Sequence, residues 1–175
     1  DKSNYELTSH VKHNKMLISS KALGKYHNYL YGAGVDIFPY DRLSTDPKKE
    51  KNRMELFDAL CILASLPSTD EKYITVLEYE TKKVEKLLGI KLQYSPNYRK
   101  ELLQLLKNCV QKFNQDGGHK IASLPDLTLY KDMGKGVFED SWFGADSFMN
   151  FEFLSLPAPK EYFAVIKNKY HDYGL

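Results

Sequence analysis

A block of helical apolar pattern between residues 46 and 118 constrains the fold of this chain more than any other feature. Apolar side chains recur there at steps of three and four, which is the spacing of one face of an α-helix. Pro and Gly residues divide the block twice, so the pattern predicts three helices rather than one long helix. Three such faces can pack on one another and against a sheet.

Capping residues mark the ends of the first two predicted helices. Asp46-Pro47 begins the first helix, because Asp accepts from free backbone N–H groups and Pro suits the first helical position. That helix is expected to stop near Pro67. Ser68 and Glu71 have the spacing of a capping box and predict the start of the second helix, and Gly89 predicts its C-terminal cap.

Two further helices follow in the sequence. Ser95-Pro96 is expected to open the third helix and Gly117-Gly118 to end it, whereas Pro159 is expected to start a last helix. The apolar residues expected on the four buried faces are Met54, Phe57, Cys61 and Ala64, with Leu56, Leu60 and Leu63 beside them; Tyr73, Val76, Leu77, Val84, Leu87 and Leu88; Leu102, Leu105, Leu106, Cys109, Val110 and Phe113; and Tyr162, Phe163, Ile166 and Tyr170.

The segments outside the helical block read as short strands and loops. The polar N-terminal stretch predicts one or two strands, and Gly32 and Gly34 are expected to bracket a turn. Residues 35–38 then predict a short strand that Pro39 ends, because Pro has no N–H group for a strand ladder. Residues 119–159 are rich in Gly, Asp and aromatic residues and predict loops and short strands.

Charge and cysteine content limit the possible classes of function. The net charge of +2 gives no basic field of the kind that marks a nucleic-acid-binding protein. The charged run 48–55 mixes both signs and reads as a solvated helix face, with a patch that binds phosphate or a membrane surface as the alternative. Cys61 and Cys109 lie in apolar helical patterns and read as small core residues, which favours a reducing, cytoplasmic setting. No apolar stretch has the length of a transmembrane segment.

An acidic residue among strand-forming residues is the first candidate for chemistry. Asp36 lies between Val35 and Ile37, and strand alternation places it on the opposite face from both. A carboxylate on a central strand is costly unless a metal ion or a hydrogen-bond donor pairs with it. The alternative is an Asp at a strand end that caps a turn through backbone donors.

A second acidic residue shows the same pattern near the C-terminal end. Glu152 stands between Phe151 and Phe153, and an extended run continues from there toward Pro159. It is either a functional carboxylate or a surface carboxylate on an edge strand whose Phe neighbours pack inward.

The two segments together resemble the LicD family. Residues 35–41, Val-Asp-Ile-Phe-Pro-Tyr-Asp, resemble that family's Asp-Ile-Phe-Pro-Leu-Asp motif. Phe151-Glu152, the Pro-bearing run 156–159, a helix and Tyr170-His171-Asp172-Tyr173 follow the order of the family's Phe-Glu segment, Pro stretch, helix and Tyr-Gly-Asp-Tyr ending. The match in order and approximate spacing covers most of the chain, around a variable helical middle.

The resemblance implies an α+β fold with a partial nucleotidyltransferase-like mixed sheet, a helical insertion of about three helices and a C-terminal helix, in a single domain over residues 1–175. It implies metal-dependent transfer of phosphocholine, or a related phospho-alcohol, from a CDP-activated donor to a teichoic acid, a lipopolysaccharide or another cell-surface glycan. Mg²⁺ or Mn²⁺ would be the cofactor. The glycan acceptor can be lipid-linked, so the protein would act in the cytoplasm or peripherally at the inner face of the membrane.

The resemblance also assigns roles to residues. Asp36 matches a position expected to supply a metal-binding carboxylate or a catalytic base, and the metal role is the favoured one. Asp41 would contact substrate or a second metal, or would orient the loop as a turn-forming residue. Glu152 and Asp172 are candidate substrate-binding groups. Tyr170 and Tyr173 could stack on a nucleobase or line a choline pocket, since aromatic rings bind quaternary ammonium groups well.

The chain departs from the family pattern in two places. The family's Asp-x-Asp metal motif normally lies upstream of the first matching segment, and no Asp-x-Asp occurs in the first 34 residues. The domain is therefore expected to lack that N-terminal segment. His171 also replaces the Gly of the terminal motif. An alternative function is therefore a non-catalytic nucleotide- or glycan-binding module that has lost the metal motif. A small helical DNA-binding or scaffold protein with an accidental match is a third possibility, and the near-neutral charge disfavours its DNA-binding form.

Overall fold

A computed structural model shows that the protein has an α+β fold. It describes residues 9–18, 31–66, 71–93, 95, 97–130, 135–144 and 147–170, with the backbone alone at 9–18, 31–36 and 128–130. Contacts divide the chain into two compact units, Asp1–Pro39 and Tyr40–Leu175. No helix in these described ranges combines the length and apolar character needed to cross a membrane.

The first unit contains one antiparallel strand pair, β1 (Ser9–Ile18) and β2 (Tyr31–Ile37). Strand β2 ends before Pro39, as predicted from the missing N–H group of Pro. The turn predicted at Gly32 and Gly34 is wrong, because both residues lie inside β2, opposite Leu17 and Lys12 respectively. The register shifts between these two pairings. Glycines within a strand often mark such an irregularity.

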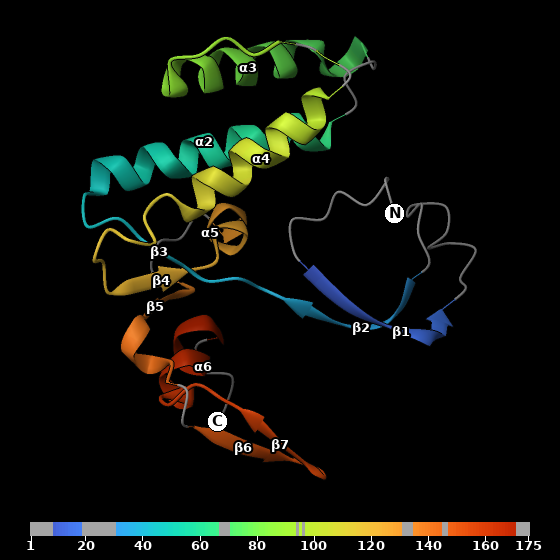
Figure 1. The fold of residues 1–175 in the computed structure, drawn as a ribbon, viewed down its shortest axis with the longest axis vertical. Helices are drawn as coiled ribbons and strands as arrows, with labels where there is room; N and C mark the ends of the chain where they lie inside the picture. The colour runs from blue at the N-terminus through green and yellow to red at the C-terminus, as the bar shows by residue number, and fades with distance from the viewer. Residues whose placement is uncertain are drawn as a thin grey trace. The chain divides into compact units, whose positions relative to one another are not determined.

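The second unit holds the remaining elements, which appear in Figure 1. In chain order they are β3 (Asp41–Arg42), α2 (Pro47–Ser65), η1 (Glu71–Tyr73), α3 (Ile74–Leu88), α4 (Tyr98–Gln111), β4 (Lys120–Ala122), α5 (Leu124–Tyr130), β5 (Val137–Glu139), η2 (Asp140–Trp142), β6 (Phe148–Phe151), β7 (Leu154–Pro157) and α6 (Tyr162–Tyr170).

Two small sheets form in this unit, one ordered β3-β4-β5 and the other the hairpin β6-β7. Every strand pair in the described ranges is antiparallel, so the expectation of a mixed sheet is wrong for this part of the chain. The physical reason is the path of the helical block. It returns the chain beside the end of β3, where the Leu43 N–H donates to the Lys120 carbonyl at 2.9 Å. Strand β4 therefore runs back along β3.

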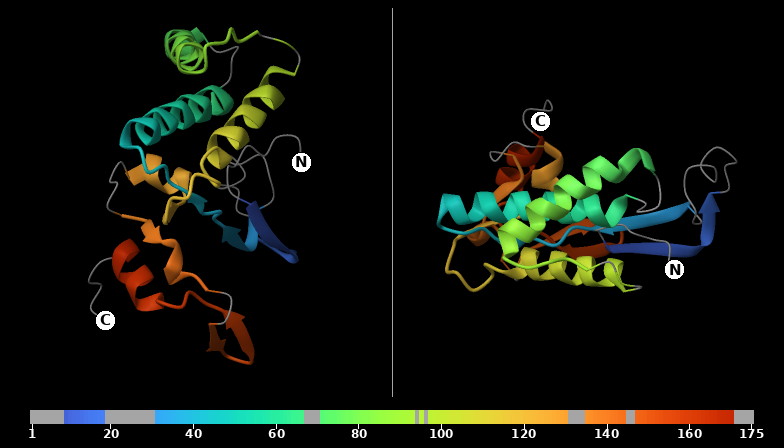
Figure 2. Two further views of the ribbon diagram at one scale, coloured as in Figure 1. Left: turned by 60° about the vertical axis from the view of Figure 1, so that its left-hand side comes forward. Right: turned by 90° about the horizontal axis from the view of Figure 1, so that it is seen from above.

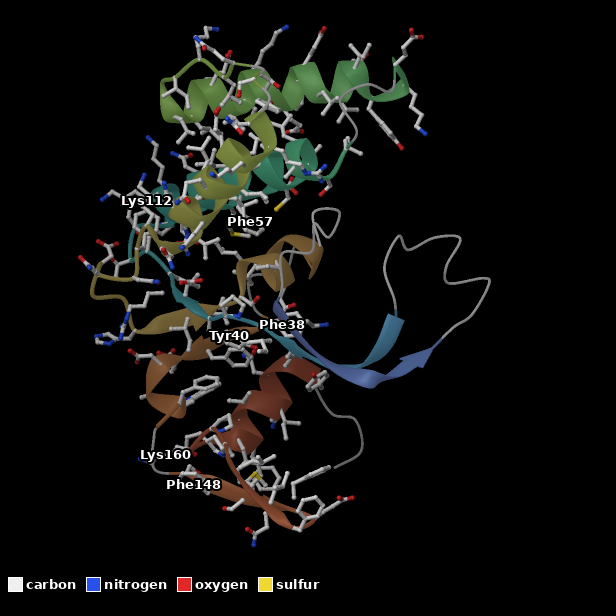
Figure 3. All side chains as sticks on the ribbon, turned by 45° about the vertical axis from the view of Figure 1, so that its right-hand side comes forward. Phe38, Tyr40, Phe57, Lys112, Phe148 and Lys160 are labelled. Carbon is white, nitrogen blue, oxygen red and sulfur yellow. The ribbon has the colours of Figure 1, made fainter. Side chains whose placement is uncertain are left out.

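The three predicted helices of the block form a stack. Helix α2 contacts both α3 and α4, and Figures 1 and 2 show α2 and α4 between α3 and the β3-β4-β5 sheet, with α6 beyond that sheet. Phe57, labelled in Figure 3, is only 1% exposed between these layers. The other fully buried large residues are Leu60, Val84, Leu102, Leu124, Leu127 and Phe138. Leu60, Val84 and Leu102 belong to the predicted apolar faces, whereas Leu124, Leu127 and Phe138 lie outside them.

The helix caps follow the predictions closely. Asp46 caps α2, and its Oδ1 accepts from the N–H groups of Lys48 at 2.9 Å and Lys49 at 3.3 Å. Gly89 ends α3 in the left-handed conformation, with φ of 67°. The α-helical part of α3 begins only at Ile74, after a 3₁₀ turn that starts at Glu71. The Ser68 half of the predicted capping box lies outside the described residues.

Other boundaries differ from the predictions by a few residues. Helix α4 ends at Gln111, where a run of turns continues toward Gly117. Helix α6 begins at Tyr162 instead of Pro159. The short helix α5 was not predicted from the sequence.

A buried ion pair joins α2 to its neighbours. Arg53 Nη2 lies 2.7 Å from Glu50 Oε1, and Arg53 Nη1 donates to the carbonyls of Arg42 and Val110 at 3.0 and 3.2 Å. The second Glu50 oxygen accepts from the Ser44 N–H at 2.7 Å. Both charged groups are thus hydrogen-bonded, which is what makes a buried pair tolerable. The pair fixes α2 against β3 and α4.

The interpretation of residues 48–55 as a solvated face is therefore only partly correct. Lys48, Lys49 and Lys51 are exposed, but Glu50 and Arg53 are buried. The spacing of three residues places Glu50 and Arg53 on one side of the helix. That side is the one that meets β3 and α4.

Candidate functional site

The two segments that resemble the LicD motifs meet at Tyr40. This residue begins the second unit, one position before β3, and its side chain appears in Figure 3. Its hydroxyl group shares a hydrogen bond with Lys169, in the last turn of α6. Lys169 directly precedes the Tyr170-His171-Asp172-Tyr173 segment. The fold thus brings the end of the first motif beside the start of the last one.

Asp126 of α5 completes the cluster. Its Oδ2 lies 2.9 Å from Lys169 Nζ, and Asp126 is itself buried. The Lys169 side chain is 22% exposed, so part of it remains open to solvent. We call Tyr40, Asp126 and Lys169 the Tyr40 cluster.

The environment shifts the pKa values of two groups in the Tyr40 cluster. Burial raises the pKa of Tyr40 above its ordinary value, and the Asp126 charge adds to this, although the Lys169 charge and hydrogen bond oppose it. Burial lowers the pKa of Lys169, but the hydrogen bond to Asp126 and the nearby Tyr40 and Asp126 outweigh it, so the pKa of Lys169 is raised. At neutral pH the cluster therefore holds an ammonium ion beside a neutral phenol.

Aromatic rings pack around the Tyr40 side chain. Its ring centroid lies 5.5 Å from that of Phe138 and 5.8 Å from that of Phe143. Phe138 also meets Trp142 edge-on at 6.3 Å. The rings contact one another directly, so they act here as packing that fixes the Tyr40 side chain. A partly exposed lysine side chain on a fixed support can bind an anionic oxygen, such as one of a phosphate group.

Asp41 holds a loop in this structure. It is 8% exposed, and its Oδ1 accepts from Asn114 Nδ2 at 2.7 Å. The Asn114 Oδ1 accepts in return from the Arg42 N–H at 3.0 Å. This reciprocal pairing ties the turn after α4 to β3. Of the two roles expected for Asp41, loop orientation is the one that this geometry supports.

Asp36 lies on β2, opposite His10 of β1. In the described ranges its sheet has two strands, so β2 is not the central strand that the sequence suggested. The structure describes the backbone alone at both residues. The metal-binding or base role of Asp36 remains a prediction.

Glu152 occupies a turn rather than a strand. Strand β6 ends at Phe151 and β7 begins at Leu154, so Glu152 and Phe153 form the two-residue loop of a hairpin. Glu152 has a φ of 53°, the left-handed conformation that such tight hairpin loops require. The expected inward packing of the two Phe residues is wrong, since Phe153 is 87% exposed and Phe151 also faces solvent.

The last candidates are near the C-terminal end of α6. Tyr170 ends that helix and is 53% exposed, so its ring is available to a ligand. Its packing on the inner face of α6, expected from helical spacing, is wrong, and the same holds for the exposed Phe163. Asp172 and Tyr173 lie outside the described residues.

The described residues do not by themselves form a metal centre. Among the side chains that the structure describes, no three His, Cys, Asp or Glu residues are grouped so as to hold a metal ion. Asp41 and Glu152 belong to different sheets, and the Asp41 carboxylate is engaged by Asn114. No step of a reaction is therefore assigned to these carboxylates.

Sequence reasoning missed two members of the Tyr40 cluster. Lys169 belongs to no recognisable local motif. The terminal motif begins one residue later, so it pointed to Tyr170 instead. Asp126 lies in the unpredicted helix α5. Ser123 and Asp126 do have capping-box spacing, which is a signal that could have revealed this helix.

No family model, curated protein or solved structure matches this chain.

Proposed function

We propose that this chain is part of a LicD-type phosphotransferase. It would transfer phosphocholine, or a related phospho-alcohol, from a CDP-activated donor to a cell-surface glycan such as a teichoic acid or lipopolysaccharide. The observation that supports this proposal best is the hydrogen bond between Tyr40 and Lys169. Because of it, Tyr40, near the end of the first motif, lies beside Lys169, which directly precedes the last motif.

The roles of residues in this proposal follow from charge and exposure. Phosphoryl transfer asks a protein mainly to position the reactants and to neutralise charge. Lys169, held charged by Asp126, would bind an oxygen of the donor diphosphate. The exposed Tyr170 ring, one residue further, would stack on the cytosine or contact the choline group. The lipid-linked acceptor would place the protein in the cytoplasm, at the inner face of the membrane.

In this proposal, Asp36 would be a ligand of the metal ion. Mg²⁺ or Mn²⁺ would neutralise the diphosphate charge in such a transferase. Calorimetric titration of CDP-choline, with and without Mn²⁺, into the wild type and Asp36→Asn tests this role. Asp58→Asn is the matched control, because Asp58 is an exposed carboxylate on α2.

Binding that needs the metal and is lost only in Asp36→Asn would support the proposal. Equal binding by both variants would contradict the role of Asp36. Tight donor binding without any transfer would favour the alternative function, a non-catalytic nucleotide- or glycan-binding module.

Tyr170 offers a second test of the same proposal. Tyr170→Ala should raise the KM for the CDP-activated donor by roughly tenfold, since stacking on one base contributes about 1–3 kcal/mol. Phe163→Ala is the control, because Phe163 is another exposed aromatic residue of α6. An equal KM for the donor in both variants would show that Tyr170 does not contact the donor.

A further inference from the structure

A groove of about 930 Å³ lies between the N-terminal half of α2 and the β3-β4-β5 sheet, away from the Tyr40 cluster. We call it the α2–β5 groove. The residues that matter for its chemistry are the apolar Leu43, Met54 and Val137 and the exposed Lys51, His119 and Lys120. Its volume is in the range that holds a small organic ligand.

The inner surface of the α2–β5 groove is mainly apolar. Leu43 follows β3 and is 6% exposed, whereas Met54 of α2 and Val137 of β5 are partly exposed. Val137 faces the groove because strand alternation sends its neighbour Phe138 to the other side, where Phe138 contacts Tyr40. Three elements thus present an apolar surface to one space. Contact with an apolar group would remove this surface from water.

Two of the three carboxylates that line the groove form ion pairs with basic residues. Glu50 is bound by Arg53, and Glu55 lies 4.0 Å from Lys51. The third, Glu139, lies opposite Lys120 in the β4–β5 register, so a positive charge on the neighbouring strand balances its own. A charged ligand would have to compete with these pairs, whereas an uncharged one would not.

We propose that the α2–β5 groove binds an uncharged amphipathic molecule, whose aliphatic chain or ring lies on Leu43, Met54 and Val137 and whose hydroxyl or carbonyl group meets His119 at the opening. An alcohol-headed lipid tail has this chemistry. The groove binds such a molecule whether or not the chain is a transferase.

The test uses N-phenyl-1-naphthylamine, an uncharged probe that fluoresces in apolar surroundings. The probe is titrated into the protein and then displaced by decanol, decanoate or decyltrimethylammonium below their micellar concentrations. Saturable binding is expected, with displacement by decanol at about tenfold lower concentration than by either charged compound. Equal displacement by all three compounds, or no saturable binding, would overturn the proposal.

Variants locate the bound probe. Met54→Lys and Val137→Lys should each weaken probe binding about tenfold, because a loss of about 1.4 kcal/mol of apolar contact corresponds to that factor. Leu154→Lys is the control, since Leu154 is an exposed apolar residue on the hairpin β6-β7. Met54→Leu keeps an apolar side chain at this position, so this variant should bind the probe as the wild type does. An equal loss in Leu154→Lys would place the probe on the hairpin and overturn the proposal.

Discussion

The Nζ atom of Lys169 lies 2.9 Å from Oδ2 of Asp126, and this ion pair links the last helix to α5. Both side chains are largely buried, so the attraction between them is only weakly screened by water. The hydrogen bond to Tyr40 then connects the pair to the segment that precedes β3. The ammonium group of Lys169 therefore connects three parts of the chain that are distant in sequence: Tyr40 before β3, helix α5 and helix α6.

Removing that ammonium group should destabilise the protein. Lys169→Met leaves the Asp126 carboxylate buried without this partner, which should lower the free energy of unfolding by about 1–3 kcal/mol. Urea denaturation followed by circular dichroism measures the change. Lys167→Met is the control, because Lys167 is an exposed lysine of the same helix. Similar losses in both variants would show that the Asp126 contact contributes nothing.

Replacement of Arg53 should destabilise the protein more than replacement of Lys169. Arg53→Met strands the buried Glu50 carboxylate, and breaking a buried pair in this way costs about 3–5 kcal/mol. Lys51→Met removes a charge from the exposed pair with Glu55 on the same helix and should change stability by less than about 1 kcal/mol. Thermal and urea unfolding of the two variants make the comparison. Equal effects would mean that the buried network does not hold α2 in place.

Both cysteines should react slowly with thiol reagents. Burial raises the pKa of Cys61 to about 12 and that of Cys109 to about 11, so at pH 8 the reactive thiolate is scarce in the folded protein. Their reaction with Ellman's reagent should be slow in buffer and fast in denaturing urea. Cys61→Ala and Cys109→Ala identify the residue that reacts. Fast reaction of the folded protein at pH 8 would contradict the raised pKa values of these thiols.

The protein should lose stability in alkaline solution. The pKa of Tyr40 is raised above its ordinary value of 10.0 and that of Lys169 above its ordinary value of 10.5. The protonated forms are therefore favoured by folding, and their contribution is fully present below about pH 10. It is lost as the pH rises through the folded-state pKa values.

A comparison of the wild type with Tyr40→Phe isolates the tyrosine part of this effect, because the cysteines titrate in both proteins. The free energy of unfolding, measured from pH 8 to pH 11.5, should fall less steeply above pH 10 in Tyr40→Phe. Parallel curves would show that Tyr40 ionises equally in the folded and unfolded protein.

The local signals in the sequence were enough to predict helices α2, α3, α4 and α6, but not the short helix α5. Asp46 and Gly89 act through backbone groups within a few residues of themselves, so their capping roles can be read without knowledge of the fold. The buried Glu50–Arg53 pair could not be predicted in this way. Its burial depends on the carbonyls of Arg42 and Val110, which reach it only after packing.

The candidate site was predicted only in part, for the same reason. Tyr40 and Tyr170 belong to the segments that resemble the LicD family, but the residues that connect them, Lys169 and Asp126, are set by tertiary contact. For Glu152, the local pattern predicted the wrong structure. Alternation suggested a strand, yet the hairpin register places it in the turn, because pairing of Phe151 with Leu154 leaves two residues for the loop.

Release of CMP from CDP-choline tests the central claim most directly. The protein is incubated with CDP-choline, Mn²⁺ and a soluble teichoic-acid fragment, and CMP and glycan-bound phosphocholine are followed by phosphorus NMR. The transferase proposal predicts equal amounts of both products, formed by the wild type and Asp58→Asn and abolished by chelation of the metal or by Asp36→Asn. Absence of both products with the wild type, or their undiminished formation by Asp36→Asn, would contradict it.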